Sequence, residues 1–426
     1  GGIIMIYDKL KLHFDSIIVD GHNDTMLRII DEETWLPKIN IGESTENHID
    51  IPKLIEGGLN IPFFAAFTSG YYDDIDKSLS STLALINALY WTEDKNRDTF
   101  KIVNTVKGIE EIVNEGKVAA VSTIEGGYSF DGNNGIELLR QYYDLGIKAI
   151  AFNWNYSNDL GEGCSKTYND PLQTSSSGGL TKLGETIALE MNRLGIIIDV
   201  SHMNESTFWD IISISKAPII ASHSGVYTLR NHPRNLTDKQ LKALAKNGGV
   251  IGIVLCARFL KEGDSAYIKD YVDHIDYAVN LIGIDHVGIG SDFDGTILPK
   301  DIKNASELFK VTEELIRRGY KDEDIEKILG KNMLRVLKEV QNKSEYNIKK
   351  NILDLSINPN YKMGEIIRDF TPLLTAKIEN FNQLEIKELD FKVIVDGIPY
   401  MASFDEERST MSFKIEKPLS EKFHVV

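Results

Sequence analysis

Cysteine is scarce in this chain of 426 residues, which contains only Cys164 and Cys256. Two thiols cannot build the disulfide framework of a small secreted protein, and such low usage is typical of a reducing compartment. An apolar run of about 18 residues, the length that a membrane-spanning helix needs, is also missing. The segment from Gly1 to Tyr7 lacks the basic start of a signal peptide. We therefore expect a cytoplasmic protein without membrane attachment.

Basic residues are outnumbered, with 47 Lys and Arg against 64 Asp and Glu and a formal net charge of -17. A surface that follows nucleic-acid phosphates needs the opposite balance, so nucleic acid is not an expected partner. The glycine-rich dinucleotide fingerprint and the Walker phosphate loop are absent as well. Hydrophobic residues (42%) and charged residues (26%) nevertheless occur in the proportions of a folded globular protein.

Eight short runs in the sequence are almost continuously apolar, which predicts strands buried on both faces. The runs are Ile17–Asp20, Ile61–Phe67, Val118–Ile124, Ile147–Phe152, Ile196–Val200, Pro218–Ser222, Val250–Leu255 and Val287–Ser291. Segments with helical spacing alternate with them, namely Ser78–Asp94, Gly135–Leu145, Leu180–Leu194, Glu205–Ser215, Asp238–Asn247 and Ala266–Ile282. This alternation predicts an α/β fold, a TIM-like (β/α)8 barrel, with an open doubly wound sheet as the alternative.

The pattern changes towards the C-terminus. Residues 305–340 are helical in pattern and are expected to close the barrel. Beyond them, Phe391–Val395 and Ser412–Glu416 are predicted strands, and Asp396-Gly397 is a tight-turn signal. We predict a barrel domain over residues 1–344 and a small α+β appendage over residues 345–426, acting as an oligomer contact or a lid.

Polar residues suited to metal binding follow the predicted strands, at the end where barrel enzymes place their reacting groups. His22 and Asp24 are two residues apart on one strand face, so they can bind one ion together. His202 and His223 follow neighbouring strands and can bind a second ion, with the two oxygens of Glu125 bridging the pair. Nitrogen and oxygen ligands suit zinc or manganese, and zinc is our first choice. Two such ions can hold a bridging hydroxide that attacks a carbonyl carbon, which predicts a hydrolase.

Two further groups on this rim are predicted to serve the reaction. Asp292, after the eighth run, is the candidate general acid and base, and its rival Asp294 is expected to cap or bond the loop. Arg230 and Arg234 follow the sixth run, and a guanidinium pairs well with a carboxylate. We assign the carboxylate-binding role to Arg234 and a surface position to Arg230.

Several motifs together carry a resemblance to a known family. They are Asp20-Gly21-His22-Asn23-Asp24-Thr25, Glu125-Gly126-Gly127, Asp199-Val200-Ser201-His202, Ala221-Ser222-His223-Ser224, His232-Pro233-Arg234-Asn235-Leu236-Thr237-Asp238 and Gly288-Ile289-Gly290-Ser291-Asp292-Phe293-Asp294-Gly295. From about residue 14 to 340, the chain resembles the membrane (renal) dipeptidases, metallopeptidase family 19 of the amidohydrolase superfamily.

The resemblance implies a dipeptidase with two zinc ions per chain, one on His22 and Asp24, one on His202 and His223, and Glu125 bridging. It also implies that Arg234 holds the carboxylate of the substrate and that Asp292 binds the substrate as well, by the scissile bond and the amino group. Family members often accept a D-residue in the second position and commonly form dimers, so a homodimer is expected.

The chain departs from the family pattern in two places. Animal members carry a substrate-binding histidine after the fourth strand, where this chain has residues 152–158 without histidine. Asn155, which we assign to substrate binding, and Trp154 are the two candidates to replace it. The segment from about residue 345 onward has no counterpart in the family's usual ending.

The function predicted from the sequence is hydrolysis of free dipeptides, L,L and also L,D, by a binuclear zinc enzyme. One alternative is another amidohydrolase acting on a lactone or cyclic amide, and the other is a metal-binding protein without catalysis. Side-chain preference depends on rim loops such as Thr25–Asp50 and Ser69–Asp76, and the sequence does not fix it.

Overall fold

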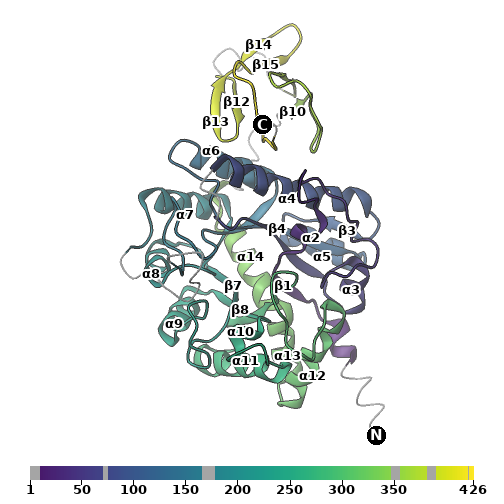
Figure 1. Cartoon of the computed structure of the whole chain (residues 1–426), viewed down its shortest axis with the longest axis vertical. Helices are drawn as coiled ribbons and strands as arrows, with labels where there is room; N and C mark the ends of the chain where they lie inside the picture. The colour runs from purple at the N-terminus through teal and green to yellow at the C-terminus, as the bar shows by residue number, and fades with distance from the viewer. Residues whose placement is uncertain (1–9, 71–74, 166–177, 347–355, 381–389, 421) are drawn as a thin grey trace.

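Eight parallel strands close into a barrel in the computed structural model, which describes residues 10–70, 75–165, 178–346, 356–380, 390–420 and 422–426 (Figure 1). The strands are β1 (Val19–Asn23), β2 (Ile61–Phe67), β4 (Val118–Glu125), β5 (Ile147–Ala151), β6 (Ile197–Asp199), β7 (Ile220–Ser224), β8 (Val250–Val254) and β9 (Val287–Gly290). Pairing of β2 with β4 completes the circle that runs through β1 and β9. The predicted barrel is confirmed, and the open sheet is excluded.

All eight predicted runs overlap these strands, because each is buried along its whole length or nearly so. A further strand, β3 (Phe100–Ile102), pairs with the start of β4, and the helix α5 (Val106–Asn114) follows it. The apolar pattern does not predict β3, because this strand has only three residues and its middle residue, Lys101, is exposed.

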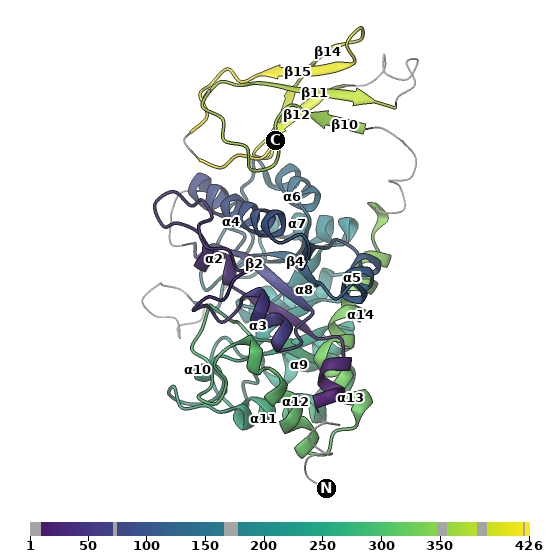
Figure 2. The same ribbon diagram turned by 90° about the vertical axis from the view of Figure 1, so that its right-hand side faces the viewer.

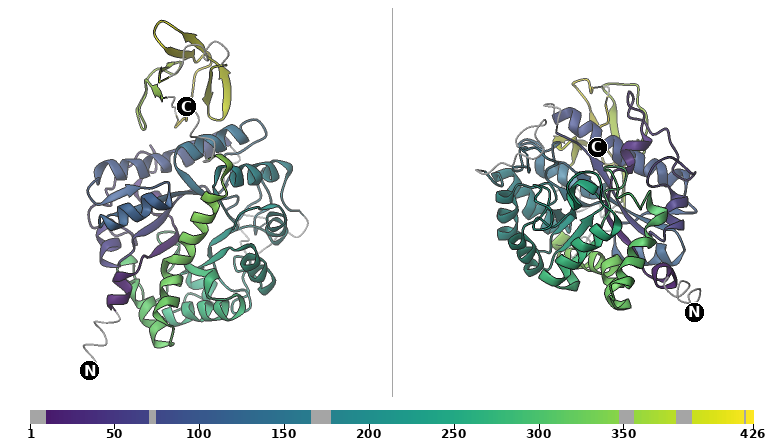
Figure 3. Two further views of the ribbon diagram at one scale, coloured as in Figure 1. Left: turned by 180° about the vertical axis from the view of Figure 1, so that it is seen from behind. Right: turned by 60° about the horizontal axis from the view of Figure 1, so that its bottom comes forward.

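Helices surround the barrel as an outer ring (Figures 1 and 3). They include α3 (Ile51–Glu56), α4 (Ile75–Lys95), α6 (Gly135–Asp144), α7 (Lys182–Leu194), α8 (Glu205–Ile214), α9 (Asp238–Asn247), α11 (Ile268–Ile282) and α12 (Phe309–Arg317). Their ends carry ordinary stop signals: α9 begins with a capping box between Thr237 and Gln240 and ends at Gly248, whose φ is 89°. None of the helices in the described part of the chain has the length and apolar character required to cross a bilayer.

The helix α14 (Asn332–Asn342) closes the amino-terminal end of the barrel. Met333, Val336, Leu337 and Val340 form one cluster with residues near the strand starts, such as Val19. In the view from behind, α14 runs diagonally across the barrel (Figure 3). The predicted closure by the helices before residue 340 is therefore confirmed, and only the opposite end of the barrel is left for a site.

Three glycines crowd around one backbone carbonyl inside the barrel. A methyl group at Gly21 would lie 2.9 Å from the carbonyl oxygen of Ser222, at Gly252 2.2 Å and at Gly290 1.8 Å. Real side chains do not approach backbone oxygens so closely. The residues of β1, β8 and β9 that lie against this part of β7 must therefore be glycine.

Antiparallel strands make up the described part of the C-terminal segment. β10 (Ser356–Pro359), β11 (Leu373–Glu379), β15 (Thr410–Lys414) and β14 (Ser403–Asp405) form one sheet, and β12 (Lys392–Val395) and β13 (Ile398–Met401) form a hairpin. Asp396 and Gly397 make its turn with φ of 51° and 82°, as predicted. The helical component expected here is not found in residues 356–380, 390–420 or 422–426, whose regular elements are antiparallel strands.

These strands sit on the outer faces of α4 and α6, away from the amino-terminal end of the chain (Figure 2). Gln141 of α6 donates to the carbonyl of Ile394 at 3.0 Å and accepts from the backbone N–H of Gly397 at 2.7 Å. Ser80 of α4 accepts from the backbone of Phe423 at 3.1 Å. The contact thus joins the appendage to the ring of helices.

Candidate active site

The carboxyl ends of five barrel strands bring the predicted metal ligands and Asp292 together. His22 lies in β1, Glu125 ends β4 and His223 lies in β7, while His202 follows β6. Asp24 and Asp292 follow β1 and β9, and every one of these side chains is buried. Ligand atoms of three overlapping groups lie within 4.8 Å of one another, namely His22, Asp24 and Glu125; Glu125, His202 and His223; and His22, His223 and Asp292.

Glu125 occupies the centre of this cluster. Its Oε2 lies 3.2 Å from Nε2 of His22, and its Oε1 lies 2.8 Å from Nε2 of His202 and 3.3 Å from Nε2 of His223. Nε2 of His22 is also 3.7 Å from Oδ2 of Asp24. One carboxylate oxygen therefore faces the β1 side of the cluster, and the other faces the pair of histidines from β6 and β7.

Buried atoms without partners show that this cluster fits divalent cations. Nε2 of His22 and Oδ1 of Asp24 have no hydrogen-bond partner among the described residues. Leaving such atoms unsatisfied in the interior is costly. Imidazole nitrogens and carboxylate oxygens are the ligand set of zinc and related ions, and their close approach here suits an ion on either side of Glu125.

The electrostatics of the cluster reflect burial and mutual charge. Burial would raise the pKa of Glu125, but His22 and His202 outweigh it and hold the pKa well below its usual range. Burial, reinforced by Arg234, lowers the pKa of His202 to about 3. Burial and the neighbouring carboxylate of Asp24 raise the pKa of Asp292 well above its usual value. The cluster therefore contains one carboxyl whose pKa is lowered, Glu125, and another whose pKa is raised, Asp292.

Unusual backbone conformations aim two of these side chains. His202 and Asp292 adopt φ of 66° and 61°, in the left-handed region that residues other than glycine seldom enter. Such strain persists only where the surroundings enforce it, and it gathers at functional sites.

Arg234 lies beside His223, on the loop between β7 and α9. Its Nη2 donates to the carbonyl of His223 at 2.7 Å, and its side chain is packed near the ring of Phe259. The residue is only 4% exposed, and its Nε has no hydrogen-bond partner within the described residues. Arg230, by contrast, donates to the backbone of Arg258 near the surface. Of the two arginines, only Arg234 reaches the cluster.

Asn155 lies behind His202. Its Oδ1 accepts a hydrogen bond of 2.8 Å from Nδ1 of His202, and Cys164 Sγ lies 3.2 Å from the same oxygen. The neighbouring Trp154 ring is 6.1 Å from the His202 ring. The direct substrate contact predicted for Asn155 stays a prediction.

Asp294 holds a rim loop in place. Its carboxylate accepts from the backbone N–H groups of His48 at 2.6 Å and Ile49 at 3.2 Å and from the Thr25 hydroxyl at 2.8 Å. These bonds are of the kind predicted for Asp294 when the acid and base role was given to Asp292. Of the two predicted specificity loops, residues 25–50 are described, whereas residues 71–74 of the loop Ser69–Asp76 lie outside the described residues.

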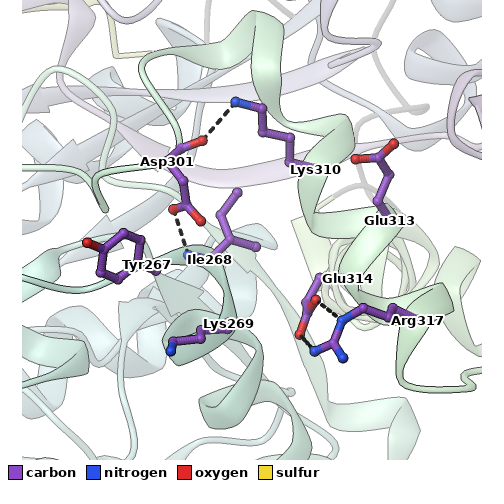
Figure 4. A pocket seen from close by; sticks show the side chains of 8 residues that line it. All are labelled: Tyr267, Ile268, Lys269, Asp301, Lys310, Glu313, Glu314 and Arg317. Atoms are coloured by element: carbon purple, nitrogen blue, oxygen red, sulfur yellow. Dashed lines mark hydrogen bonds and ion pairs between the residues drawn. The ribbon is translucent and has the colours of Figure 1, made fainter.

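A hollow of about 530 Å³ lies on the outer ring of helices, beside α11 and α12 (Figure 4). Several of its charged side chains already have partners: Glu314 pairs with Arg317, and Lys310 donates to the carbonyl of Asp301. It is lined by residues of α11, of α12 and of the segment between them, and none of the proposed site residues borders it. The strand-end cluster is the better candidate.

Two buried aspartates behind the cluster, Asp20 and Asp199, have no role in the prediction from the sequence. Asp20 accepts from the backbone and hydroxyl of Ser291, both at 2.6 Å, and Asp199 accepts from the backbone and hydroxyl of Ser222. Each pair joins neighbouring strands, and each serine directly precedes a site residue. The repeated Asp-Ser combination in the motifs was the available signal.

A closed parallel barrel with this cluster at the carboxyl ends of its strands defines a metal-dependent hydrolase of the amidohydrolase type. The membrane dipeptidase family, peptidase family M19, matches residues 8–351. The chain belongs to this family and is a metallo-dipeptidase.

Solved structures of related proteins resemble the chain over about three quarters of its length. A metallopeptidase of family M19 called dipeptidase AC is 29% identical, with a TM-score of 0.68 over 76% of this chain and 99% of its own. A metallopeptidase from Rhodobacter sphaeroides, solved with a phosphinate mimic of the dipeptide L-Ala-D-Ala, is 27% identical, with a TM-score of 0.68 and the same coverage. The probable dipeptidase PvdM from Pseudomonas aeruginosa is 25% identical, with a TM-score of 0.71 over 79% of this chain and 98% of its own.

Proposed function

We propose that this protein hydrolyses free dipeptides, of L,L and L,D configuration, with two zinc ions bridged by Glu125. The position of Glu125 carries the proposal, since its two oxygens face two separate sets of ligands. His22 and Asp24 would hold one ion, and His202 and His223 the other. Bound there, the ions would lower the pKa of a water shared between them and polarise the carbonyl of the scissile bond.

Asp292 is the proposed proton carrier. Its Oδ1 lies 4.0 Å from Nε2 of His22, at the edge of the cluster, and burial and Asp24 raise its pKa above the usual carboxyl value, the direction that suits a group that both takes up and gives a proton. Asp292 would accept a proton from the attacking water and deliver it to the nitrogen of the departing amino acid. An uncharged amide in its place would leave the amine without a proton donor.

Arg234 is the proposed anchor for the carboxylate of the substrate. Its unpartnered Nε lies in a buried setting, where a charge-assisted hydrogen bond to a carboxylate is strong. An anchor beside the metal ligand His223 would hold the free carboxylate close to the scissile bond, as in a dipeptide. Selection of dipeptides over longer peptides would follow from that short span.

The acceptance of a D-residue at the second position has support from a relative. The Rhodobacter sphaeroides metallopeptidase, 27% identical to this chain, was solved with a mimic of L-Ala-D-Ala. A D-residue places its carboxylate on the same anchor while its side chain points to the other side. The loop of residues 25–50, fixed by Asp294, is the part of the rim that would sense this difference.

The test is hydrolysis of matched L,L and L,D dipeptides by zinc-loaded protein, beside N-blocked and C-amidated versions and a chelated control. We expect cleavage of free dipeptides, strong loss on amidation, and no activity after chelation. Two bound metals without cleavage of any dipeptide would refute the proposal and favour a lactone or cyclic amide as substrate. Activity that persists after verified removal of metal would refute the metal mechanism.

Three other expectations belong to this proposal. The protein would work in the cytoplasm, form a homodimer, and divide into a barrel domain of residues 1–344 and an appendage of residues 345–426. Light scattering behind a sizing column gives the oligomeric state directly. A mass of one chain, 47.9 kDa, would refute the dimer.

A further inference from the structure

Asp199 binds two neighbouring strands just behind the proposed metal ligands. Its Oδ1 accepts from the backbone N–H groups of Ser201 at 3.0 Å and Ser222 at 2.9 Å. Its Oδ2 accepts from the hydroxyl of Ser222 at 2.5 Å. Asp199 is 5% exposed and Ser222 only 2%, so water does not compete for these bonds.

The hydroxyl of Ser222 contacts His223 as well. A serine hydroxyl has one proton, and the carboxylate of Asp199 can only accept, so that proton lies on the bond to Asp199. The remaining lone pairs of Ser222 can only accept, so they accept from Nδ1 of His223, 2.8 Å away, and from the hydroxyl of Ser201 at 3.3 Å. Nδ1 of His223 therefore carries the proton of the ring, and Nε2 keeps its lone pair.

That lone pair points into the cluster, since Nε2 of His223 lies 3.3 Å from Oε1 of Glu125 and 3.0 Å from Nε2 of His202. We infer that Asp199 and Ser222 are positioning residues that fix the tautomer of His223 in which Nε2 is free to bind a metal ion. The inference deepens the proposed function, on whose assignment of His223 as a ligand it rests. Partners behind a ligand of this kind commonly change metal affinity about 10-fold to 100-fold when removed.

A second pair in the same barrel provides a matched control. Ser291 bonds the carboxylate of Asp20 through its backbone and its hydroxyl, both at 2.6 Å, just as Ser222 bonds Asp199. The other contacts of the Ser291 hydroxyl are the backbone of His22 at 3.2 Å and of Phe293 at 3.0 Å, not a ring nitrogen. Removing this hydroxyl breaks an equivalent bond between strands without touching a histidine tautomer.

The substitution Asp199→Asn reverses the polarity of the chain of hydrogen bonds while keeping its shape. The amide oxygen must stay at Oδ1 to accept the two backbone N–H groups, so the amide nitrogen takes the place of Oδ2. That nitrogen donates to Ser222, whose own proton then turns to its nearest acceptor, Nδ1 of His223. The ring proton moves to Nε2, where it blocks metal binding. Adding Ser222→Ala removes the donor and frees the ring again.

The experiment measures metal content after dialysis, metal affinity by competition with a chromogenic chelator, and the tautomer of His223 by 15N NMR of the metal-free full chain. For one of the two ions we expect S222A to bind about 10-fold to 100-fold more weakly than wild type. D199N should lose more than S222A, and D199N/S222A should recover towards the S222A value. S291A should stay within about threefold of wild type.

A purely structural role predicts a different pattern. Equal losses in S222A and S291A, or a double variant weaker than D199N, would overturn the inference. So would an Nε2 proton on His223 in the metal-free wild type. Because the NMR and metal readouts need no substrate, absence of dipeptide hydrolysis would refute the proposed function while leaving this test intact. Should D199N fail to fold, S222A and S291A still decide the matter, since each removes only a hydroxyl.

Discussion

Replacing Arg234 by methionine tests the proposed carboxylate anchor most directly. Methionine keeps much of the length of the side chain and its packing near Phe259, but it cannot bind an anion. A hydrogen bond to a charged group contributes about 1.5–3 kcal/mol, and little of this is lost to screening at a residue that is 4% exposed. The expected loss of kcat/KM on a free dipeptide is therefore about 10-fold to 150-fold, mainly as a rise in KM.

The same variant also loses a bond inside the protein, because Nη2 of Arg234 donates to the carbonyl of His223. A C-amidated dipeptide separates the two effects, since it lacks the carboxylate but needs the same intact site. We expect R234M to change kcat/KM on the amide by about threefold or less. Nearly the whole loss expected on the free dipeptide should therefore appear in the ratio of kcat/KM for the free dipeptide to kcat/KM for the amide. Arg230→Met is the control on the same loop: Arg230 is half-buried and donates to the backbone of Arg258, away from the cluster, so both values should stay within about twofold.

Steady-state kinetics on the free and amidated forms of one dipeptide, for wild type and both variants, measures this ratio. Parallel thermal melts show how much the lost bond to His223 weakens the fold. If R234M lowered kcat/KM equally on both substrates, Arg234 would be a structural residue and the anchor would have to be sought elsewhere on the rim.

Other predictions concern the proton carrier, the rim loop, a buried histidine and the metals. Asp292→Asn should lower kcat about 100-fold to 10,000-fold with little change in KM, and an unchanged kcat in stopped-time assays would exclude the proton role. Asp294→Ala leaves the buried backbone N–H of Ile49 and the partly buried one of His48 without this acceptor and should cost about 2–4 kcal/mol of unfolding free energy in urea, against about 1 kcal/mol or less for an exposed control such as Asp98→Ala. Burial outweighs a bond to Gly57 and lowers the pKa of His13, so this ring stays neutral in the fold, accepting from Thr312 through Nδ1, while the unfolded chain takes up a proton below about pH 6.5. The neutral His13 ring contributes its full share of the unfolding free energy above that pH, and this share falls on acidification by at most about 1.4 kcal/mol per pH unit. Urea titrations in which the unfolding free energies of wild type and H13Q fell equally steeply with pH below about 6.5 would refute this. Chelation should lower the melting temperature by calorimetry, and zinc should restore it, because ions that bind only the folded state stabilise it.

Much of the barrel could be predicted because its strands are buried on both faces and so appear as unbroken apolar runs. The site could be predicted from one rule, that the residues after parallel strands meet at one edge of the barrel. This rule predicts from the sequence alone that Glu125 lies between two sets of ligands. Hydrogen bonds between side chains on different strands could not be predicted from the sequence. The link from Asp199 through Ser222 to His223 depends on the register of β6 against β7, which no local pattern records.

Backbone conformation was also hidden in the sequence. Nothing in the residues around His202 or Asp292 announces a positive φ, because that conformation is imposed by neighbouring strands. β3 was not predicted, because an exposed lysine interrupts its apolar run of only three residues. The two predicted C-terminal strands, Phe391–Val395 and Ser412–Glu416, overlap β12 and β15, and the turn at Asp396 and Gly397 was predicted from its residues. The expected helices had no comparable pattern of residues behind them.

The glycines packed against the Ser222 carbonyl limit how this enzyme can be altered. A side chain at Gly21, Gly252 or Gly290 would collide with a backbone oxygen that cannot move without displacing its neighbour His223. Random mutagenesis should therefore return no tolerated changes at these positions, and the inner wall beside the ligands is closed to redesign. New substrate preferences would have to be engineered in the rim loops, with the barrel kept as a fixed frame.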